Sequence, residues 1–267
     1  MLNEYKQQVV DFFDRRTAYD TEGDSHPQEA QRLLKYVPIE QGQTILDIAT
    51  GTGLIAIPAS KIFGNSSVIG VDISSVMLDQ ARKKIAAQNI KNLELIEADI
   101  ELVEFAPQQF DLIFCCSALV YISNIPAIID RCYQWLKPGG CFTFTTPDKI
   151  SHLADIRVKV CHDLFDIDLP HIVRPLWTPE KCRRLLQQSG FKNIEIESHQ
   201  FSKSKISQNY DSVRIEREFY PRGNPLMNLS AAQKEQLQAA YKQTVKQLIS
   251  EGGIWRENNN LFVKAYK

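Results

Sequence analysis

Short apolar runs alternate with segments of helical period along the middle of the chain. The runs are bounded by turn-forming residues and predict strands at 44–48, 67–72, 93–98, 110–115 and 141–146. Between them, apolar residues recur at helical spacing near 54–63, 75–88 and 126–136. The last helix is expected to end at Lys137-Pro138-Gly139-Gly140, because proline and glycine stop a helix and turn the chain. Strands that alternate with helices are typical of a parallel sheet covered by helices.

The segments on either side of this alternation predict a cap and two insertions. Residues 1–40 show two helical patterns divided by a loop near 21–27, and residues 148–177 show no clear strand. Beyond them we predict a helix at 178–189, a strand at 192–198, a helix at 230–250 and a last strand at 261–266. The expected organisation is an α/β core at 41–198 and 261–267, a helical cap at 1–40, and insertions at 148–177 and 199–260 that form a lid over the ends of the strands.

Composition and charge narrow the class of protein. The 267 residues include 31 Lys+Arg and 32 Asp+Glu, a formal net charge of −1, which argues against a general nucleic-acid binder. The six cysteines form no C-x-x-C pair, so we expect reduced thiols and no metal site. The first residues lack the basic and apolar regions of a signal peptide, and no apolar run is long enough to span a membrane. The sequence therefore favours a cytoplasmic protein.

A glycine-rich turn joins the first predicted strand to the helix that follows. The segment 45–56 reads Ile-Leu-Asp-Ile-Ala-Thr-Gly-Thr-Gly-Leu-Ile-Ala, and from Gly51 it satisfies the G-x-G-x-x-A pattern of dinucleotide-binding folds. Glycines in such a turn allow positive φ angles and let a ligand approach the backbone amides closely. The turn alone leaves the cofactor open, and a nicotinamide-dependent oxidoreductase is one alternative.

Three aspartates at successive strand ends favour one kind of ligand. Asp47 ends the first strand just before the glycines, which is a poor position for an anionic pyrophosphate. Asp72 ends the second strand about 20 residues after Gly53, where a carboxylate accepts hydrogen bonds from ribose hydroxyls. Asp99 follows the third strand, where a carboxylate can accept a hydrogen bond from the exocyclic amine of adenine. Together they predict a crevice of negative potential that suits a nucleoside with a positive charge.

These motifs, with the Phe-Asp-Leu-Ile segment at 110–113 and the Leu-Lys-Pro-Gly-Gly segment at 136–140, resemble the class I S-adenosylmethionine-dependent methyltransferases over residues 44–146. The glycine turn is most similar to that of the ubiquinone/menaquinone-type and related small-molecule enzymes, although Ala49 stands where that family most often has glycine. The resemblance implies a Rossmann-like, doubly wound, seven-stranded, mostly parallel sheet with an antiparallel C-terminal strand.

The same resemblance implies S-adenosyl-L-methionine as cofactor. Asp47 would support the glycine turn, Asp72 would hold the ribose diol, Asp99 would accept from the adenine amine, and Ser117 would lie near the sulfonium. The implied cofactor-binding residues are Asp47, Ala49, Gly51, Thr52, Gly53, Asp72, Ile73, Met77, Asp99, Ile100, Ser117 and Tyr19.

The methyl acceptor is less constrained by the sequence. Residues 116–119 read Cys-Ser-Ala-Leu and lack the Asn/Asp-Pro-Pro-Tyr/Phe motif of enzymes that methylate adenine or glutamine amino groups. We therefore expect a small-molecule acceptor, with oxygen slightly favoured over nitrogen or carbon, and the segment 251–256 suggests secondary metabolism. Tyr121 and His26 are the candidate base or orienting residues. A cofactor-binding protein without turnover is the non-enzymatic alternative.

Arginines in the two insertions are candidate partners for an acidic acceptor. The simpler interpretation of each is a solvated, charged helix face. These residues are Arg157, Arg174, Arg214, Arg217 and Arg222.

Overall fold

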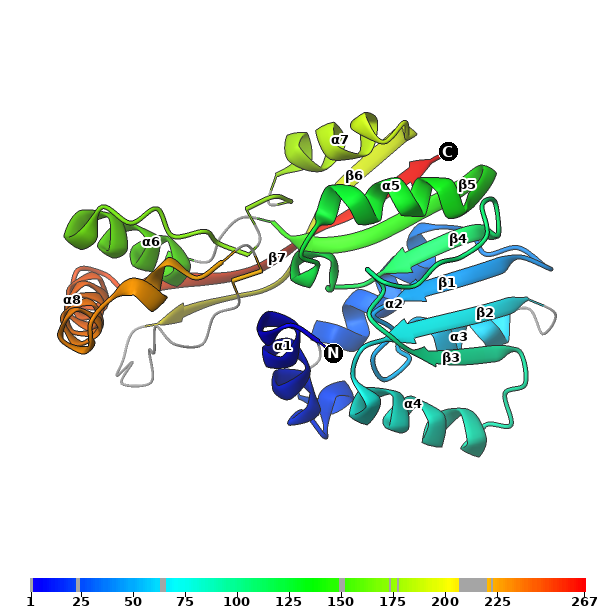
Figure 1. Cartoon of the computed structure of the whole chain (residues 1–267), viewed down its shortest axis with the longest axis horizontal. Coiled ribbons are helices and arrows are strands. Elements are labelled where there is room, and N and C mark those ends of the chain that lie inside the picture. The colour runs from blue at the N-terminus through cyan, green and yellow to red at the C-terminus, as the bar shows by residue number, and fades with distance from the viewer. Residues whose placement is uncertain are drawn as a thin grey trace.

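The computed structural model describes residues 2–22, 25–62, 66–148, 152–172, 174–176, 178–206, 220–221 and 223–267. In these residues, seven strands form one sheet with helices on both faces (Figure 1). The strands are β1 Thr44–Ile48, β2 Ser67–Asp72, β3 Leu93–Glu97, β4 Phe110–Cys115, β5 Leu136–Pro147, β6 Lys192–Ile206 and β7 Ile254–Tyr266. The helices are α1 Glu4–Asp14, α2 Ser25–Tyr36, α3 Ala56–Ile62, α4 Ser75–Ala87, α5 Ile125–Trp135, α6 His152–Phe165, α7 Pro179–Gln188 and α8 Ala231–Ser250.

The order of the strands across the sheet is β3-β2-β1-β4-β5-β7-β6. The pairs from β3 to β5 are parallel, and β7 runs antiparallel to both β5 and β6. This confirms the predicted doubly wound, mostly parallel sheet with an antiparallel C-terminal strand. The direction of winding changes between β1 and β4, and sheets of this kind bind ligands beyond the carboxyl ends of their strands at that point.

Two hydrophobic clusters cover the two faces of the sheet. Successive residues of a strand point to opposite faces, so Ile45 belongs to one cluster and Leu46 to the other. The helices α2 and α3 pack on the face of Ile45, and α5 and α7 pack on the face of Leu46. Because both faces are covered, the central strands appear in the sequence as continuous apolar runs, which made them predictable.

Helix caps follow the sequence signals. Thr178 caps α7, as predicted, and its Oγ1 accepts a hydrogen bond from the backbone N–H of Lys181 at 3.3 Å. At the start of α8, Ser230 and Gln233 form a capping box in which each side chain accepts from the backbone of the other. The boundaries of both helices are therefore fixed locally.

Both final strands extend beyond the predicted limits. β6 continues past Ser198 to Ile206, and β7 begins at Ile254 rather than at Leu261, so the insertion predicted at 199–260 begins and ends as sheet. The added segments pair with each other as far as Ile206 and Ile254. The stretch 202–205 reads Ser-Lys-Ser-Lys, so hydrophobic alternation gives no strand signal there.

The structure also corrects two other boundaries. β5 begins at Leu136, directly after α5, and its pairing with β4 shifts register between Phe110 and Leu112, so the Pro-Gly-Gly turn lies within the strand as an irregularity. In the segment 148–177, where the sequence shows no clear strand, the structure has a helix, α6 His152–Phe165.

The helices α6 and α8 pack on each other through a separate hydrophobic cluster. Its buried residues include Val160, Cys161, Leu169, Leu237, Tyr241 and Val245. Figure 1 shows both helices at the end of the long β6–β7 ribbon, away from the parallel strands. No helix in the described part of the chain is long and apolar enough to cross a membrane.

Candidate functional site

A cavity opens at the carboxyl ends of the central strands, with α1 and the segment after it forming part of its wall. The predicted site residues that line it are Tyr19, His26, Asp47, Ala49, Gly51, Thr52, Asp72, Ile73, Met77, Asp99, Ile100, Ser117 and Tyr121. Gly53 does not line it. Helix α1 contributes Lys6, Val9, Val10 and Phe13, none of which the sequence patterns indicated.

Asp47 holds the glycine turn from beneath. Its side chain is buried, and its Oδ2 accepts hydrogen bonds from the Thr50 hydroxyl at 2.6 Å and from the backbone N–H of Ala56 at 3.2 Å. Burial raises the pKa of Asp47 from 3.8 to about 7, because a charged carboxylate loses its hydration there. The turn is thus fixed by a side chain that precedes it by only a few residues.

The raised pKa of Asp47 makes the stability of the ligand-free protein depend on pH. The folded state binds this proton more tightly than the unfolded state, so the favourable contribution is complete below about pH 4 and is lost as the pH rises towards 7. Asp47→Asn keeps an oxygen for Thr50 and Ala56 but carries no titrating group. We expect the unfolding free energy of the wild type to fall relative to this variant between pH 4 and 7, by about 1.4 kcal/mol per unit of pKa difference.

Urea unfolding of both proteins at several pH values measures this difference. Asp72 titrates in both proteins, so its contribution cancels in the comparison. A free-energy difference that stays constant from pH 4 to 7 would show that Asp47 is ionised in the folded state.

Asp72 connects the glycine turn to α4. Its Oδ2 accepts from the backbone N–H of Gly51 at 2.7 Å, and its Oδ1 accepts from the backbone N–H of Ser74 at 2.9 Å. Burial raises the pKa of Asp72 to about 6. Ser74 in turn caps α4 by accepting from the backbone N–H of Met77 at 3.0 Å. One carboxylate therefore sets the relative positions of the two segments that flank the cavity.

Backbone conformation explains the residue types in the turn. Ala49, Gly51 and Gly53 all have positive φ, at 54°, 54° and 83°. A Cβ atom on Gly53 would lie 2.7 Å from Cδ1 of Ile57, so this glycine is required for the packing of the turn on α3. The left-handed conformation of Ala49 accounts for the glycine that related sequences most often carry there.

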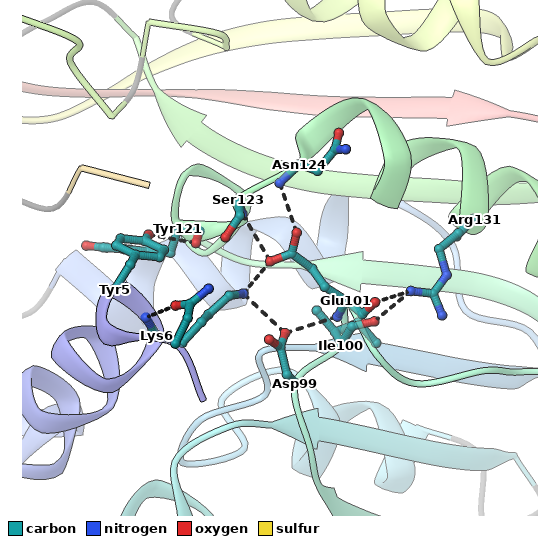
Figure 2. A network of polar contacts seen from close by, with 10 residues as sticks. Tyr5, Lys6, Asp99, Ile100, Glu101, Tyr121, Ser123, Asn124 and Arg131 are labelled. Atoms are coloured by element: carbon teal, nitrogen blue, oxygen red, sulfur yellow. Dashed lines mark hydrogen bonds and ion pairs between the residues drawn. The ribbon is translucent and has the colours of Figure 1, made fainter. Parts of the chain in front are cut away.

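A charged network contributes Lys6 and Asp99 to the wall of the cavity, and Figure 2 shows the contacts of this network. The ammonium group of Lys6, on α1, forms ion pairs with Asp99, at 3.1 Å from its Oδ1, and with Glu101. Glu101 also accepts hydrogen bonds from the backbone N–H groups of Ser123 and Asn124. Lys6 is 7% exposed, so this pairing compensates for the burial of its charge.

Aromatic side chains also contribute to the wall of the cavity. The ring of Tyr19 stacks on His26 with centroids 4.6 Å apart, and the Arg16 guanidinium lies 4.4 Å from the Tyr19 ring centroid. Nη2 of Arg16 is 3.4 Å from Nε2 of His26. Burial, and then the charge of Arg16, lower the pKa of His26, so the imidazole is neutral at pH 7. Burial raises the pKa of Tyr121, whose phenol stays protonated.

Further polar contacts join the cap to the sheet. The hydroxyl of Ser74 donates to Asp14, and the hydroxyl of Thr52 donates to Asp20, which also pairs with Lys84. These contacts link residues far apart in the sequence, so no local motif indicates them. They place the segment after α1 directly over the glycine turn.

Glu29 is a second buried acid that the sequence patterns did not indicate. It lies on α2, is 3% exposed, and has Thr145 and Ser117 beside its carboxyl group. Burial raises its pKa, and these neighbours lower it in part. Ser117, which adopts a φ of 54°, also donates its backbone N–H to Oγ1 of Thr145 at 2.8 Å. Glu29 therefore contacts Ser117, which lines the cavity.

Only two of the candidate arginines of the insertions belong to the described part of the chain, and neither lines this cavity. Arg157 and Arg174 are described and are absent from its wall. Arg214, Arg217 and Arg222 lie outside the described residues. Among the residues that the structure places, no group of three or more His, Cys, Asp or Glu side chains is arranged to hold a metal ion.

Comparison with known proteins identifies the family. A family model described as a methyltransferase domain matches residues 45–140. Demethylmenaquinone methyltransferase from Chlorobaculum parvum is 30% identical over 182 residues, which cover 62% of this chain and 73% of that protein. The chain belongs to the S-adenosylmethionine-dependent methyltransferases.

Two further proteins are similar to this methyltransferase over a smaller share of their own length. Aklanonic acid methyltransferase DauC from Streptomyces sp. (strain C5) is 29% identical over 146 residues, covering 54% of this chain and 66% of that one. A structure of phosphoethanolamine N-methyltransferase 2 from Haemonchus contortus in complex with S-adenosyl-L-methionine has a TM-score of 0.58 and 23% identity, and the match covers 100% of this chain and 60% of that one. This last similarity shows a shared fold. The chain thus spans less than two thirds of the length of both proteins.

The cofactor of this methyltransferase is S-adenosyl-L-methionine. The cavity fits such a ligand, because Asp47, Asp72 and Asp99 supply acidic groups toward a cation and hydrogen-bond acceptors toward hydroxyl and amino groups. Oδ2 of Asp99 accepts no hydrogen bond from any residue in the described ranges, and it remains available to a ligand.

Proposed function

We propose that this methyltransferase transfers the methyl group of S-adenosyl-L-methionine to a small organic acceptor, with oxygen slightly favoured over nitrogen or carbon. The observation that carries the proposal is the meeting, in one cavity, of the strand-end aspartates and the aromatic residues of the cap. The acids suit the cationic donor, and the aromatic rings offer an apolar surface to an acceptor. Two relatives are named for demethylmenaquinone and aklanonic acid, which are small molecules.

The residues of the chain would act mainly by positioning. S-adenosyl-L-methionine supplies a methyl group on a sulfonium, so an in-line approach and the exclusion of water account for most of the catalysis. We propose that Asp72 holds the ribose of the donor, that Asp99 holds its adenine and that Gly51 lies beneath its methionine part. Ser117 would lie towards the sulfonium. The apolar residues of α1 exclude water from above, since Val9 and Val10 line the cavity and are buried.

Transfer to a hydroxyl oxygen also requires a proton to leave. As the acceptor oxygen forms its bond to the methyl carbon, the bond from that carbon to sulfur breaks, and the hydroxyl proton passes to a base or to water. His26 is the proposed base because its ring is neutral at pH 7. Tyr121, which keeps its phenolic proton, is proposed to orient the acceptor through a hydrogen bond. A carboxylate acceptor would need neither residue as a base.

We also propose that residues 1–40 form the cap over this cavity. The side chains that α1, Tyr19 and His26 contribute to the wall support this assignment. The division into a core at 41–198 and 261–267 and insertions at 148–177 and 199–260 stays a proposal, and so does the role of these insertions as a lid over the acceptor.

Thermal unfolding with added ligands tests the donor side of the proposal. S-adenosylhomocysteine is expected to raise the melting temperature by several degrees, because a ligand at about 100 times its dissociation constant adds about 2.7 kcal/mol. NADH and NADPH are expected to leave it unchanged. Stabilisation by a nicotinamide cofactor alone would contradict the proposal.

Radiolabelled S-adenosyl-L-methionine, incubated with pools of small metabolites, tests transfer itself. Label is expected to appear in a small molecule only when the protein is present. Persistent absence of transfer, despite tight binding of S-adenosylhomocysteine, would favour a cofactor-binding protein without turnover.

A further inference from the structure

One oxygen of the Asp99 carboxylate is occupied by the protein itself. Oδ1 accepts from the Lys6 ammonium at 3.1 Å and from the backbone N–H of Glu101 at 3.0 Å. No residue in the described ranges donates to Oδ2. The Asp99 side chain is 9% exposed and lines the cavity. The two oxygens are therefore in different environments, and only Oδ2 is left for a ligand.

Lys6 is itself held in place. Its ammonium lies between Asp99 and Glu101, and Glu101 is fixed by the backbone N–H groups of Ser123 and Asn124 at 3.1 and 2.9 Å (Figure 2). A buried ammonium that left these carboxylates would lose its compensation for lost hydration. Lys6 is thus a rigid contact between α1 and the segment that follows β3, although 93 residues separate Lys6 from Asp99.

A second cation fixes the same segment through its backbone. Nη1 of Arg131, on α5, donates to the carbonyl oxygens of Ile100 at 3.3 Å and Glu101 at 2.7 Å (Figure 2). Ile100 lines the cavity next to Asp99. The segment 99–101 is therefore held from α1 by Lys6 and from α5 by Arg131, and of these two cations only Lys6 contacts the Asp99 carboxylate, beside the backbone N–H of Glu101.

We propose that Lys6 is a positioning residue for adenine recognition. By occupying Oδ1, it fixes the carboxylate of Asp99 so that Oδ2 accepts a hydrogen bond from the 6-amino group of adenine. A carboxylate in this state has acceptors only, so it favours a purine with an amino group at C6 over one without. This inference rests on the proposed function, which places the adenine of S-adenosyl-L-methionine against Asp99.

Calorimetric titration with two ligands separates this role from a merely structural one. The ligands are S-adenosylhomocysteine and its analogue in which hydrogen replaces the 6-amino group. Lys6→Met keeps the apolar stem but removes the charge and the donor. We expect this variant to raise the dissociation constant of S-adenosylhomocysteine by about tenfold or more, which is the scale of one hydrogen bond to a charged group. The dissociation constant of the analogue is expected to change by less than about twofold.

Matched variants control for loosening of α1. Tyr5→Phe removes the hydrogen bond from the Tyr5 hydroxyl to the Tyr121 carbonyl, at 2.7 Å, without touching Asp99. This variant should change the dissociation constants of both ligands equally, by less than about threefold. Lys6→Arg retains the charge and should restore the preference for the amino group. Lys6→Leu, which has neither the charge nor the donor, repeats the test if Lys6→Met does not fold.

The outcomes distinguish the inference from the proposed function. Equal weakening of the binding of both ligands by Lys6→Met or Lys6→Leu, or no weakening of either, would overturn the role of Lys6 while the wild type still bound S-adenosylhomocysteine. Failure of the wild type itself to bind S-adenosylhomocysteine would overturn the proposed function and this inference together.

Discussion

Replacement of Asp72 by alanine is expected to weaken the binding of S-adenosylhomocysteine by more than about tenfold, or about 1.4 kcal/mol for each decade. The carboxylate accepts from the backbone N–H groups of Gly51 and Ser74, and it is the proposed acceptor for the ribose hydroxyls. Alanine removes that acceptor and leaves two donors unpaired in a buried site, each at a cost of about 1–3 kcal/mol. Isothermal titration calorimetry measures the dissociation constant directly.

Asp79→Ala is the matched control for this variant. Asp79 lies on α4 a short distance along the chain, its side chain is 60% exposed, and it forms an ion pair with Arg82. Its replacement should leave the dissociation constant within about twofold, since exposed ion pairs contribute little. An unchanged constant in Asp72→Ala, with normal binding by the wild type, would remove the ribose assignment.

Gly53→Ala is expected to destabilise the protein by about 2–4 kcal/mol. At a φ of 83°, any side chain costs about 1–2 kcal/mol in backbone strain. The added Cβ would also lie 2.7 Å from Cδ1 of Ile57, so the Ile57 side chain must shift, while Cβ of Ala81 at 3.6 Å is in ordinary contact. Because the same turn carries Gly51, the affinity for S-adenosylhomocysteine should fall as well. Urea unfolding and calorimetry measure the two effects.

Gly139→Ala is the control that separates the cost of packing the added methyl group from the cost of backbone strain. Gly139 has a φ of 80°, almost the same as Gly53, but no atom lies within 4 Å of the position of its Cβ. It should lose only about 1–2 kcal/mol of stability and no affinity. Equal losses of stability in the two variants would mean that Ile57 yields to the methyl group without cost.

The strand-end acids were predictable because the sheet is covered on both faces. Burial of β1 and of most of β2 leaves apolar runs with sharp ends, so Asp47 and Asp72 could be placed at one edge of the sheet from the sequence alone. Asp99 could be placed beside them because it follows the next predicted strand, although β3 is an edge strand and is only partly buried. The glycine turn could be placed in the same way. The prediction was incomplete for Gly53, which the structure assigns to packing against α3 rather than to the wall of the cavity.

Contacts between distant segments escaped prediction for a physical reason. Lys6 appears in the sequence as an ordinary polar position of an amphipathic helix, and only the tertiary structure brings it to Asp99 and Glu101. Glu29 is similar, because its burial depends on Ser117 and Thr145 from two different strand ends. The extension of β6 was missed because backbone pairing with β7, rather than side-chain burial, defines it.

The long β6–β7 ribbon carries the hydrophobic cluster around α6 and α8 at its far end. Strands rise about 3.3 Å per residue, so the stretch of β6 beyond Ser198 extends the strand by roughly 26 Å. The buried residues of that cluster belong to neither of the clusters that cover the sheet. For protein engineering, the ribbon is a junction at which one part can be exchanged while the packing around the glycine turn stays intact.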